Sequence, residues 1–485
     1  MTPLRVLHAT AELYPLVKTG GLADVTGALP AAQAALGLDV RVLLPGLPGV
    51  HAGMPALHEV ARLGPAFGAA RVALLQGRLP GSNVTAYVID APWLYARNGN
   101  PYVRADGSEW PDNHRRFGLL SWVGAQLAAG GLDPAWSPDV VHAHDWHAAL
   151  TPAYLASQPA ARAASVFTIH NLAYQGRFEH DLFPELGLPP WMASLAGIEF
   201  HGELRFMKAG LVFADRITTV SPTYAQEILG PEHGHQLDGV LAPRRERLSG
   251  IVNGIDDAVW NPATDRALAA RYDARRPAGK AACKRALQRE FKLTEAADAP
   301  LFGIVSRLSH QKGLDLLLDA LPALLQAGGQ IALLGTGDAA IEHAFRNAAT
   351  ALAGSVGVQI GYDESLAHRI IAGADLIVVP SRFEPCGLTQ LYGLRYGTLP
   401  LVRRTGGLAD TVTDADAPDG TGFVFEHADA GALGWTIGRA AQAFRDTAGW
   451  RRMMATAMAQ DWSWRGPAAA YHALYQEIAR DPQAA

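Results

Sequence analysis

The chain has 485 residues, of which 49% are hydrophobic and 18% are charged. This length is too great for one ordinary domain and the apolar content indicates a large core, so we expect two or three domains. The 41 Lys and Arg residues against 46 Asp and Glu residues give a net charge of −5 without a long basic run, which argues against nucleic acid as the main partner.

The sequence also argues against export and against a membrane partner. The chain runs from Met1 almost directly into an apolar segment typical of a strand, so no signal peptide is expected. No apolar run is long enough to span a bilayer. The two cysteines, Cys283 and Cys386, lie far apart and match no disulfide or metal-binding pattern. We therefore expect a protein of the reducing cytoplasm.

The first half of the chain alternates short apolar runs with helical segments, which is typical of an α/β domain with a parallel sheet. Segments 71–76 and 84–89 predict a hairpin or paired strands, and residues 46–70 are rich in loops. The apolar runs that predict strands are 4–9, 40–45, 138–147, 165–171 and 216–222.

A glycine-rich loop separates the first strand from a helix that is predicted to begin near Leu22. It contains Lys18, Thr19, Gly20 and Gly21. Two glycines before a helix permit close approach of the backbone to a ligand, and Lys18 adds a positive charge. A glycine-rich turn with a solvated lysine explains the pattern equally well.

The stretch from Trp93 to Asn113 is polar and aromatic. Sugars stack on aromatic rings and bond to nearby amides and carboxylates, so this stretch, including Tyr95, is a candidate sugar contact. A loop packed onto the core by its aromatic side chains explains the stretch equally well.

Two predicted strands of this half end in polar residues. The segment 138–147 ends in His142, His144, Asp145 and His147, and 165–171 ends in His170 and Asn171. A metal site is the weaker interpretation, because the histidines alternate with apolar residues and no familiar set of ligands is complete. Polar tips on two strands of one sheet favour a binding site.

The chain changes domain around 248–256, and residues 258–299 are polar and predict helices. Strands and helices then alternate again, which predicts a second doubly wound α/β domain. Its predicted strands are 301–306, 330–334, 358–360, 376–379 and 399–402. The segment 404–412 resembles 18–25, either by coincidence of helix starts or because both are ligand-facing glycine loops.

Two cations flank the end of the strand 301–306. Arg307 follows the strand, and Lys312 precedes a helix that begins near Gly313. Cations that flank a strand end can converge on a diphosphate, an interpretation that we favour over two solvated charges.

The segment 381–389 links the strand 376–379 to a helix predicted over 388–396. The free N–H groups at a helix start bind phosphate, and ligands of open α/β sheets lie at the carboxyl ends of strands. Glu384 lies in this segment, and a carboxylate beside an anion site suggests a catalytic role.

Six motifs in this order resemble the bacterial glycogen synthase and plant starch synthase family, and the resemblance covers nearly the whole chain. They are Lys18-Thr19-Gly20-Gly21-Leu22, His142 to His147, Thr168 to Leu172, Asn253-Gly254-Ile255-Asp256, Ser306 to Leu308 with Gln311-Lys312-Gly313, and Arg382 to Leu388.

The resemblance implies an α/β fold of the GT-B type, with two Rossmann-like doubly wound domains facing a deep cleft. It implies an acceptor-side domain at 1–247, a nucleotide-sugar domain at 248–461, and a C-terminal helix at 462–485 that returns to the first domain. It implies transfer of glucose from ADP-glucose to the non-reducing end of an α-1,4-glucan such as glycogen, with retention. Fixed cations near the leaving group make a metal unnecessary, and no cofactor is expected.

The motifs described above, taken together with the resemblance, give the candidate site residues. The catalytic residues are Glu384, His170, Arg307 and Lys312. The donor-binding residues are Lys18, Gly20, Gly21, Arg307, Lys312, Cys386, Gly387, Leu388 and Thr389. The acceptor or sugar contacts are Asp24, Tyr95, Asp145, Trp146, His170, Asn171 and Asn253.

One departure from the wider retaining GT-B pattern is Tyr392, which stands where many such enzymes carry a second glutamate. The alternatives are a related GT-B enzyme with UDP-glucose or another acceptor, and a non-catalytic glucan-binding protein. The second alternative predicts loss of the cations or of Glu384, and both are present.

Overall fold

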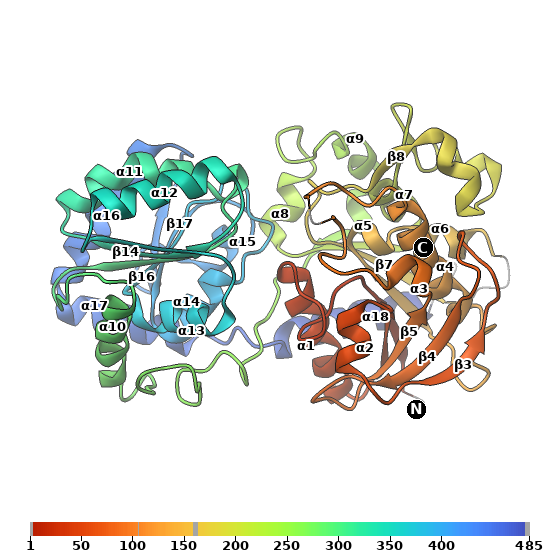
Figure 1. Cartoon of the computed structure of the whole chain (residues 1–485), viewed down its shortest axis with the longest axis horizontal. Coiled ribbons are helices and arrows are strands. Elements are labelled where there is room, and N and C mark those ends of the chain that lie inside the picture. The colour runs from red at the N-terminus through yellow and green to blue at the C-terminus, as the bar shows by residue number, and fades with distance from the viewer. Residues whose placement is uncertain (1–2, 105, 159–162, 481–485) are drawn as a thin grey trace. The chain divides into compact units, whose positions relative to one another are not determined.

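The computed structural model describes residues 3–104, 106–158 and 163–480 and divides the chain into two compact units (Figure 1). The first unit holds the chain up to Gly254 and again from Trp464, and the second unit holds Ile255–Ser463. The sequence predicted the division after residue 247 and a returning segment at 462–485, of which 481–485 lie outside the described residues.

The first unit is built on a sheet with the order β12-β11-β7-β6-β1-β2-β5-β4-β3. Its strands are parallel except for the pairings of β3 with β4 and of β4 with β5. The strands are β1 Arg5–Ala9, β2 Asp39–Pro45, β3 His58–Arg62, β4 Ala73–Arg78, β5 Thr85–Asp90, β6 Val140–His144, β7 Ala164–Ile169, β11 Arg216–Thr219 and β12 Leu248–Gly250. A small sheet is formed by β8 Arg177–Glu179, β9 Glu199–Phe200 and β10 Glu203–Arg205.

The C-terminal helix of the chain completes the core of the first unit. Tyr471 and Tyr475 of this helix, with Trp464 before it, pack in one cluster with Val6 and Val140 of the central strands. The helices of this unit are α1 Gly21–Ala35, α2 Pro48–Gly53, α3 Pro92–Tyr95, α4 Asn113–Ala128, α5 Asp145–Ala148, α6 Leu150–Ala156, α7 Phe206–Phe213, α8 Pro222–Glu227, α9 Asp238–Leu241 and α18 Arg465–Arg480.

The second unit has a fully parallel sheet with the order β15-β14-β13-β16-β17-β18. The strands are β13 Leu301–Val305, β14 Gln330–Gly335, β15 Val356–Ile360, β16 Leu376–Val379, β17 Leu399–Arg403 and β18 Phe423–Phe425. Both faces of this sheet are covered, which explains why its strands are continuous apolar runs.

Helices α11, α12 and α16 lie on one face of this sheet and α10, α13 and α14 on the other (Figure 1). The helices of the second unit are α10 Ala278–Glu290, α11 Leu314–Gln326, α12 Ala339–Ala351, α13 Glu364–Gly373, α14 Thr389–Tyr396, α15 Gly406–Thr411, α16 Ala430–Arg445 and α17 Thr447–Ala459.

The predicted strands of both halves and the hairpin of β4 with β5 are confirmed. Two expectations were wrong. Residues 258–299 contain one helix, α10, and are otherwise turns and irregular segments, because polar, turn-rich sequence was read as helical. Residues 46–70 contain α2 and the edge strand β3, whose mostly exposed side chains give no apolar pattern.

Both sheets reverse their strand order at one point, which lies between β1 and β6 in the first unit and between β13 and β16 in the second. In open α/β sheets ligands bind outside the carboxyl ends of the strands at this reversal. The loops that follow these four strands therefore define the candidate site in each unit.

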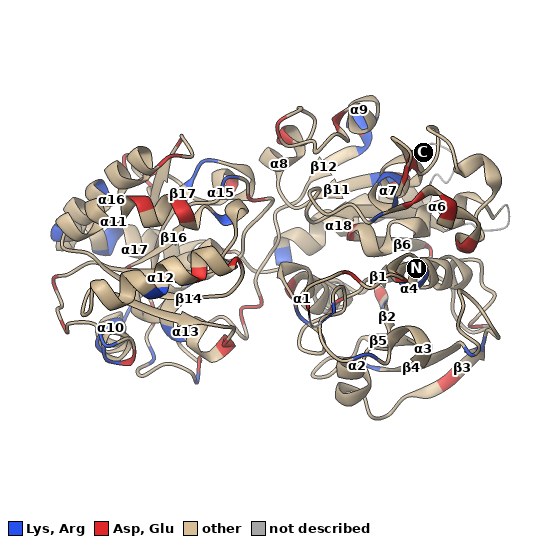
Figure 2. Ribbon diagram, turned by 45° about the horizontal axis from the view of Figure 1, so that its top comes forward, with Lys and Arg blue, Asp and Glu red and all other residues tan. Residues whose placement is uncertain are grey.

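Charge and membrane propensity complete the description. Figure 2 shows Lys and Arg interspersed with Asp and Glu over both units. No helix of the part of the chain that the structure describes is long and apolar enough to cross a bilayer.

Candidate active site

Glu384 lies in the loop that follows β16, where strand order reverses in the second unit. Its side chain is buried, with only 5% of the residue exposed. One carboxylate oxygen, Oε2, accepts a hydrogen bond from Lys312 Nζ at 2.5 Å and another from Ser381 Oγ at 2.9 Å. Lys312 precedes α11, so the loops after both central strands meet at this carboxylate.

Two glycines hold the backbone of Glu384 in place. The N–H of Gly407 donates to the Glu384 carbonyl at 3.1 Å. A Cβ atom at Gly406 would lie 2.0 Å from the same carbonyl oxygen, and one at Gly407 would lie 2.2 Å from the Cys386 carbonyl. Gly406 also has a φ of 44°, which favours glycine. This glycine pair therefore serves close packing of backbone under the Glu384 loop.

The loop ends at the beginning of α14. Leu388 is the N-cap residue, Thr389 is the first helical residue, and Gly387 has a positive φ of 76°. Gln390 Nε2 donates to the carbonyls of Cys386 and Gly387 at 3.0 and 2.9 Å, which fixes the turn. Cys386 is only 4% exposed, so it can offer a ligand little of its thiol.

Arg307 lies on the loop between β13 and α11, on the same edge of the sheet as Lys312, and its side chain is exposed. A further residue of this edge was missed from the sequence. Tyr362 follows β15 and is 68% exposed, and its hydroxyl bonds to Glu364. An exposed aromatic ring at the carboxyl edge of a doubly wound parallel sheet suits stacking against a nucleotide base. Only its exposure, which sequence does not reveal, distinguishes it from core tyrosines.

In the first unit, Glu12 organises the glycine-rich loop after β1. Its carboxylate accepts hydrogen bonds from Thr19 N and Thr19 Oγ1, both at 2.5 Å, from Gly20 N at 3.4 Å, and from the Tyr102 hydroxyl. Burial is the main cause that raises the pKa of Glu12. The Gly20 amide, which we expected to face the donor phosphates, is thus directed to Glu12.

Lys18 and Asp24 form an ion pair across this loop, with Nζ and Oδ1 2.9 Å apart. Both side chains are about one-fifth exposed. A Cβ atom at Gly20 would meet nothing within 4 Å, unlike one at Gly406. The two similar glycine motifs therefore differ in structure, because the first is open and the second is packed.

Asp145 begins α5 directly after β6, with an unusual φ of 58°. It is buried, and backbone groups of Trp146 and Asn171 bond to its carboxyl. Burial, more than the nearby Glu12 carboxyl, raises the pKa of Asp145 to about 8. The carboxyl is therefore largely protonated at neutral pH and can donate a hydrogen bond.

His170 follows β7, the strand beside β6, and is only partly exposed. Its Nε2 lies 3.0 Å from His144 Nδ1. Burial lowers the pKa of His170 to about 3, so the imidazole is neutral. His170, Asn171 and Asp145 thus share one edge of the sheet, as the sequence predicted from two polar strand ends.

Three other residues that were predicted to contact the sugar or the acceptor are buried. The prediction for Tyr95 was wrong, because its ring is fully buried and its hydroxyl donates to the Arg116 carbonyl at 2.6 Å. Trp146 is 8% exposed and packs edge-on against Phe117. Asn253 is 5% exposed, and its buried Oδ1 has no hydrogen-bond partner among the described residues.

Comparison with known proteins agrees with this geometry. Residues 5–243 match the family described as the starch synthase catalytic domain, and residues 287–442 match glycosyl transferases group 1. A protein from Leptothrix cholodnii named glycogen synthase is 56% identical over 98% of this chain and 100% of its own length. Glycogen synthases of Serratia proteamaculans and Variovorax paradoxus are 55% and 53% identical, over 98% of this chain and 100% and 99% of their own lengths. The chain belongs to the glycogen synthase family.

Members of this family are retaining glycosyltransferases, and solved structures support the GT-B fold. The catalytic domain of starch synthase IV from Arabidopsis thaliana, bound to ADP and acarbose, has a TM-score of 0.90 and 32% identity over 99% of this chain and 100% of its own. Sucrose-phosphate synthase from Thermosynechococcus elongatus, covering 98% of this chain and 99% of its own, has a TM-score of 0.61 at 18% identity, which shows the fold alone.

The departure at Tyr392 has a structural explanation in this member of the glycogen synthase family. Tyr392 is 8% exposed and stacks on Trp260, with ring centroids 3.7 Å apart. The other face of Trp260 stacks on His368 at 3.8 Å. An aromatic stack therefore fills the position of the second glutamate, and Tyr392 supplies packing there in place of a carboxylate.

Proposed function

We propose that the protein transfers glucose from ADP-glucose to the non-reducing end of an α-1,4-glucan such as glycogen, with retention at the anomeric carbon. The observation that carries this proposal is the buried Glu384 carboxylate, paired with Lys312 beside the start of α14. The names of the relatives and the ADP and acarbose bound to the starch synthase support the donor and acceptor classes.

The second unit is proposed to bind the donor. Charge grows on the nucleoside diphosphate as it leaves, and fixed cations stabilise it without a metal. Lys312 has three N–H donors and can therefore contact a phosphate while it bonds to Glu384. Arg307 and the first amides of α14, at Leu388 and Thr389, add positive potential at the same edge.

The first unit is proposed to bind the sugar and the acceptor. Neutral Asp145 and neutral His170 suit hydrogen bonds to sugar hydroxyls, because neither brings a charge to the uncharged glucosyl ring. Asn171 follows β7, Trp146 lies in α5 directly after β6, and Asp24 lies in the first turn of α1. Asn253 offers an amide oxygen without a partner among the described residues. Lys18 and Gly21 remain proposed donor contacts, and so does the open Cα side of Gly20, whose N–H is directed to Glu12.

The proposed chemistry is displacement on the front face of the sugar. The bond from the anomeric carbon to the phosphate oxygen breaks, the bond to the acceptor hydroxyl oxygen forms on the same face, and the hydroxyl proton passes to the departing phosphate. Glu384 holds the sugar and stabilises its developing positive charge. Its place on the loop that leads into the phosphate-binding helix supports the same face as the leaving group.

The interspersed positions of basic and acidic residues along the ribbon (Figure 2) and the absence of a membrane-spanning helix among the described residues support a protein without nucleic acid or membrane partners. The free, buried cysteines Cys283 and Cys386 support a cytoplasmic location.

Initial rates with ADP-glucose or UDP-glucose, and glycogen as acceptor, test the proposal. We expect ADP-glucose to be used at least tenfold more efficiently and the product to carry new α-1,4 linkages by NMR. Glu384→Ala is the control for contaminating activity. Equal use of UDP-glucose would contradict the donor, and transfer only to a small sugar would contradict the acceptor.

A further inference from the structure

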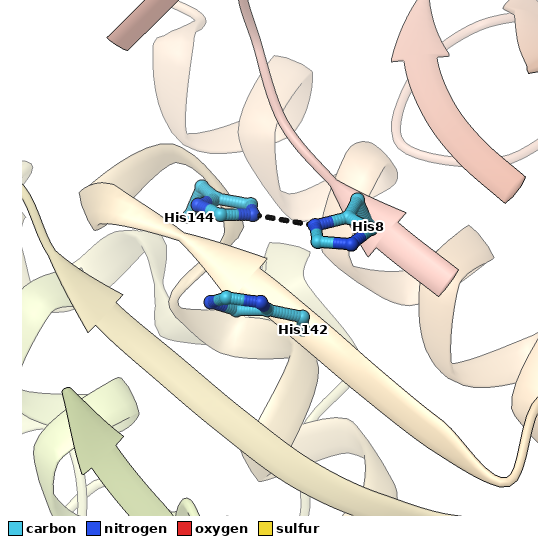
Figure 3. A group of neighbouring side chains, drawn as sticks. All are labelled: His8, His142 and His144. Carbon is cyan, nitrogen blue, oxygen red and sulfur yellow. Dashed lines mark hydrogen bonds between the residues drawn. The ribbon is translucent and has the colours of Figure 1, made fainter. Parts of the chain in front are cut away.

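A chain of buried hydrogen bonds leads from His170 to the C-terminal helix of the protein. His170 Nε2 lies 3.0 Å from His144 Nδ1, and His144 Nε2 lies 2.9 Å from His8 Nδ1, the link drawn in Figure 3. His8 Nε2 lies 2.7 Å from Gln33 Oε1, and Gln33 Nε2 donates to the Tyr475 hydroxyl at 3.0 Å. All four residues beyond His170 are fully buried.

The same region could be read as a metal site, since His8, His142 and His144 offer ring nitrogens within 4.8 Å of one another (Figure 3). Ring geometry opposes this reading. The rings of His142 and His144 stack with centroids 4.0 Å apart and planes at 28°. The lone pair of an imidazole nitrogen lies in the ring plane, so nitrogens of stacked rings do not aim at one point.

Each ring nitrogen of these three histidines is also engaged in a hydrogen bond. His142 Nδ1 lies 2.6 Å from the Tyr475 hydroxyl, and His142 Nε2 lies 2.5 Å from Thr168 Oγ1. The Tyr475 phenol keeps its proton, because burial raises its pKa well above the usual value. Tyr475 therefore accepts from Gln33 and donates to His142.

The direction of every bond in the chain follows from Gln33. Burial lowers the pKa of His8 to about 4 and that of His144 well below its usual value, so both rings are neutral. A neutral imidazole has one N–H and one lone pair. The Gln33 carbonyl oxygen can only accept, so His8 donates through Nε2 and accepts through Nδ1.

The same alternation of one N–H donor and one lone pair per ring continues along the series of hydrogen bonds. His144 donates through Nε2 to His8, so His144 Nδ1 carries the lone pair and accepts from His170 Nε2. The proton of His170 is thereby placed on Nε2, and its lone pair is left on Nδ1. This nitrogen bonds to no other described residue, and His170 is partly exposed.

We propose that Gln33 and Tyr475 are positioning residues that fix the tautomer of His170, so that His170 Nδ1 accepts a hydrogen bond from a hydroxyl of the transferred sugar. Because the Tyr475 hydroxyl donates its proton to His142, it can only accept from Gln33, which directs the Gln33 N–H to Tyr475 and its carbonyl to His8. Three histidine rings transmit that orientation to the sheet edge. The part concerning the sugar rests on the proposed function. The C-terminal helix α18 thus acts on the site through hydrogen bonds as well as through packing.

The tautomer can be read directly by NMR of protein labelled with ¹⁵N-histidine, since protonated and unprotonated ring nitrogens differ widely in chemical shift. A His170→Gln sample assigns the signals. In the native protein we expect Nε2 protonated and Nδ1 unprotonated. Gln33→Met, which removes both amide bonds, should bring the two His170 signals toward an average. Gln33→Glu, whose carboxylate also accepts from His8, should keep the native pattern.

Kinetics provide the second readout. Tyr475→Phe and Gln33→Met should lower kcat by about fivefold or more, the effect of one lost hydrogen bond, with little change in the KM for the donor. Tyr154→Phe is the matched control, because it removes another buried hydroxyl of the first unit, bonded to the Leu186 carbonyl at 2.6 Å. It should leave kcat unchanged.

Two results would overturn the inference. One is a native His170 that is protonated on Nδ1. The other is a Gln33→Met protein with the native tautomer. Both come from NMR without substrate, so they leave the proposed function intact. Failure of the native enzyme to use ADP-glucose would contradict the proposed function and leave the tautomer result standing.

Discussion

Lys312 Nζ lies 2.5 Å from Glu384 Oε2, and the two residues come from loops on opposite sides of the strand reversal in the second unit. Their side chains are only 18% and 7% exposed. A buried carboxylate needs a partner of opposite charge, so Lys312 has a structural role as the partner of Glu384 in addition to its proposed contact with a phosphate. It holds the Glu384 carboxylate in one position, next to the start of α14.

The first prediction separates the structural role of this pair from its catalytic role. Lys312→Met should lower the free energy of unfolding by about 3 kcal/mol, because it leaves Glu384 buried and unpaired. Adding Glu384→Gln should recover most of that loss, whereas turnover stays low in Lys312→Met, in Glu384→Gln and in the double variant. Urea unfolding and initial rates measure the cycle. A Lys312→Met protein as stable as the native protein would contradict the pairing argument.

The second prediction concerns the front-face assignment of Glu384. Glu384→Gln keeps the shape of the side chain and a bond with Ser381, so it should fold and bind ADP-glucose, with turnover reduced by at least about a thousandfold. Mass spectrometry after incubation of the native enzyme with a fluorinated donor should find no glucosyl adduct. A covalent adduct on Glu384 would make it a nucleophile and end the front-face proposal.

The third prediction tests the proposed contact of Arg307 with a donor phosphate. A charge-assisted contact to the leaving group is worth about 2–3 kcal/mol, so Arg307→Ala should lower kcat/KM about a hundredfold. Because the side chain is exposed, stability should hardly change. Arg285→Ala, an exposed arginine of α10, is the matched control and should be silent in both assays. Equal activity of the two variants would remove Arg307 from the site.

Most parallel strands of the two large sheets could be predicted because both faces of these sheets are covered and their strands are mainly apolar, whereas the three-residue strands β12 and β18 were missed. Glu384 and His170 could be found because polar residues at strand ends stand out against such runs. Tyr95 shows the limit of this reasoning. A tyrosine in an aromatic stretch gives no sign of whether its ring faces solvent or the core, and only packing against α4 decides it.

Contacts between residues far apart in sequence were likewise beyond prediction. Glu12 and Tyr102 meet across 90 positions to hold one loop, and Gln33 meets Tyr475 across 442. Neither pair has a local pattern, because the partners face each other only after the sheet has formed. The motifs at 18–25 and 404–412 look alike in sequence, yet one leaves space at its glycine and the other is packed against backbone.

The fourth prediction uses this difference. Gly20 has an extended φ of −163° and space for a Cβ, so Gly20→Ala should fold normally and raise the KM for ADP-glucose if the backbone there approaches the donor. Gly406→Ala should cost about 2 kcal/mol or more of stability, because both φ and the Glu384 carbonyl oppose a side chain. Gly20→Ala should therefore keep the native melting temperature and change the donor kinetics, whereas Gly406→Ala should lower the melting temperature. Similar melting temperatures would contradict the packing argument.

The fifth prediction concerns pH and Asp145. Burial raises its pKa to about 8, whereas an aspartate of the unfolded chain titrates near pH 4. Between these values the folded protein holds a proton that the unfolded chain has lost. The contribution of Asp145 to the free energy of unfolding is therefore complete below about pH 4, falls by about 1.4 kcal/mol per pH unit as pH rises, and levels off above about pH 8.

Asp145→Asn removes this dependence and suits the backbone, because asparagine tolerates a φ of 58°. The stability of the variant relative to the native protein should rise between pH 5.5 and 7.5. Asp112→Asn is the matched control. Burial alone would raise the pKa of Asp112, yet the hydrogen bond from Arg97 lowers it overall. The stability difference between Asp112→Asn and the native protein should therefore change only in acid and stay constant between pH 5.5 and 7.5. Urea unfolding of the first unit at three pH values measures both variants. Parallel pH profiles for Asp145→Asn and the native protein would mean that Asp145 is ionised in the fold, and the proposed hydrogen bond from its carboxyl to a sugar hydroxyl would be lost with it.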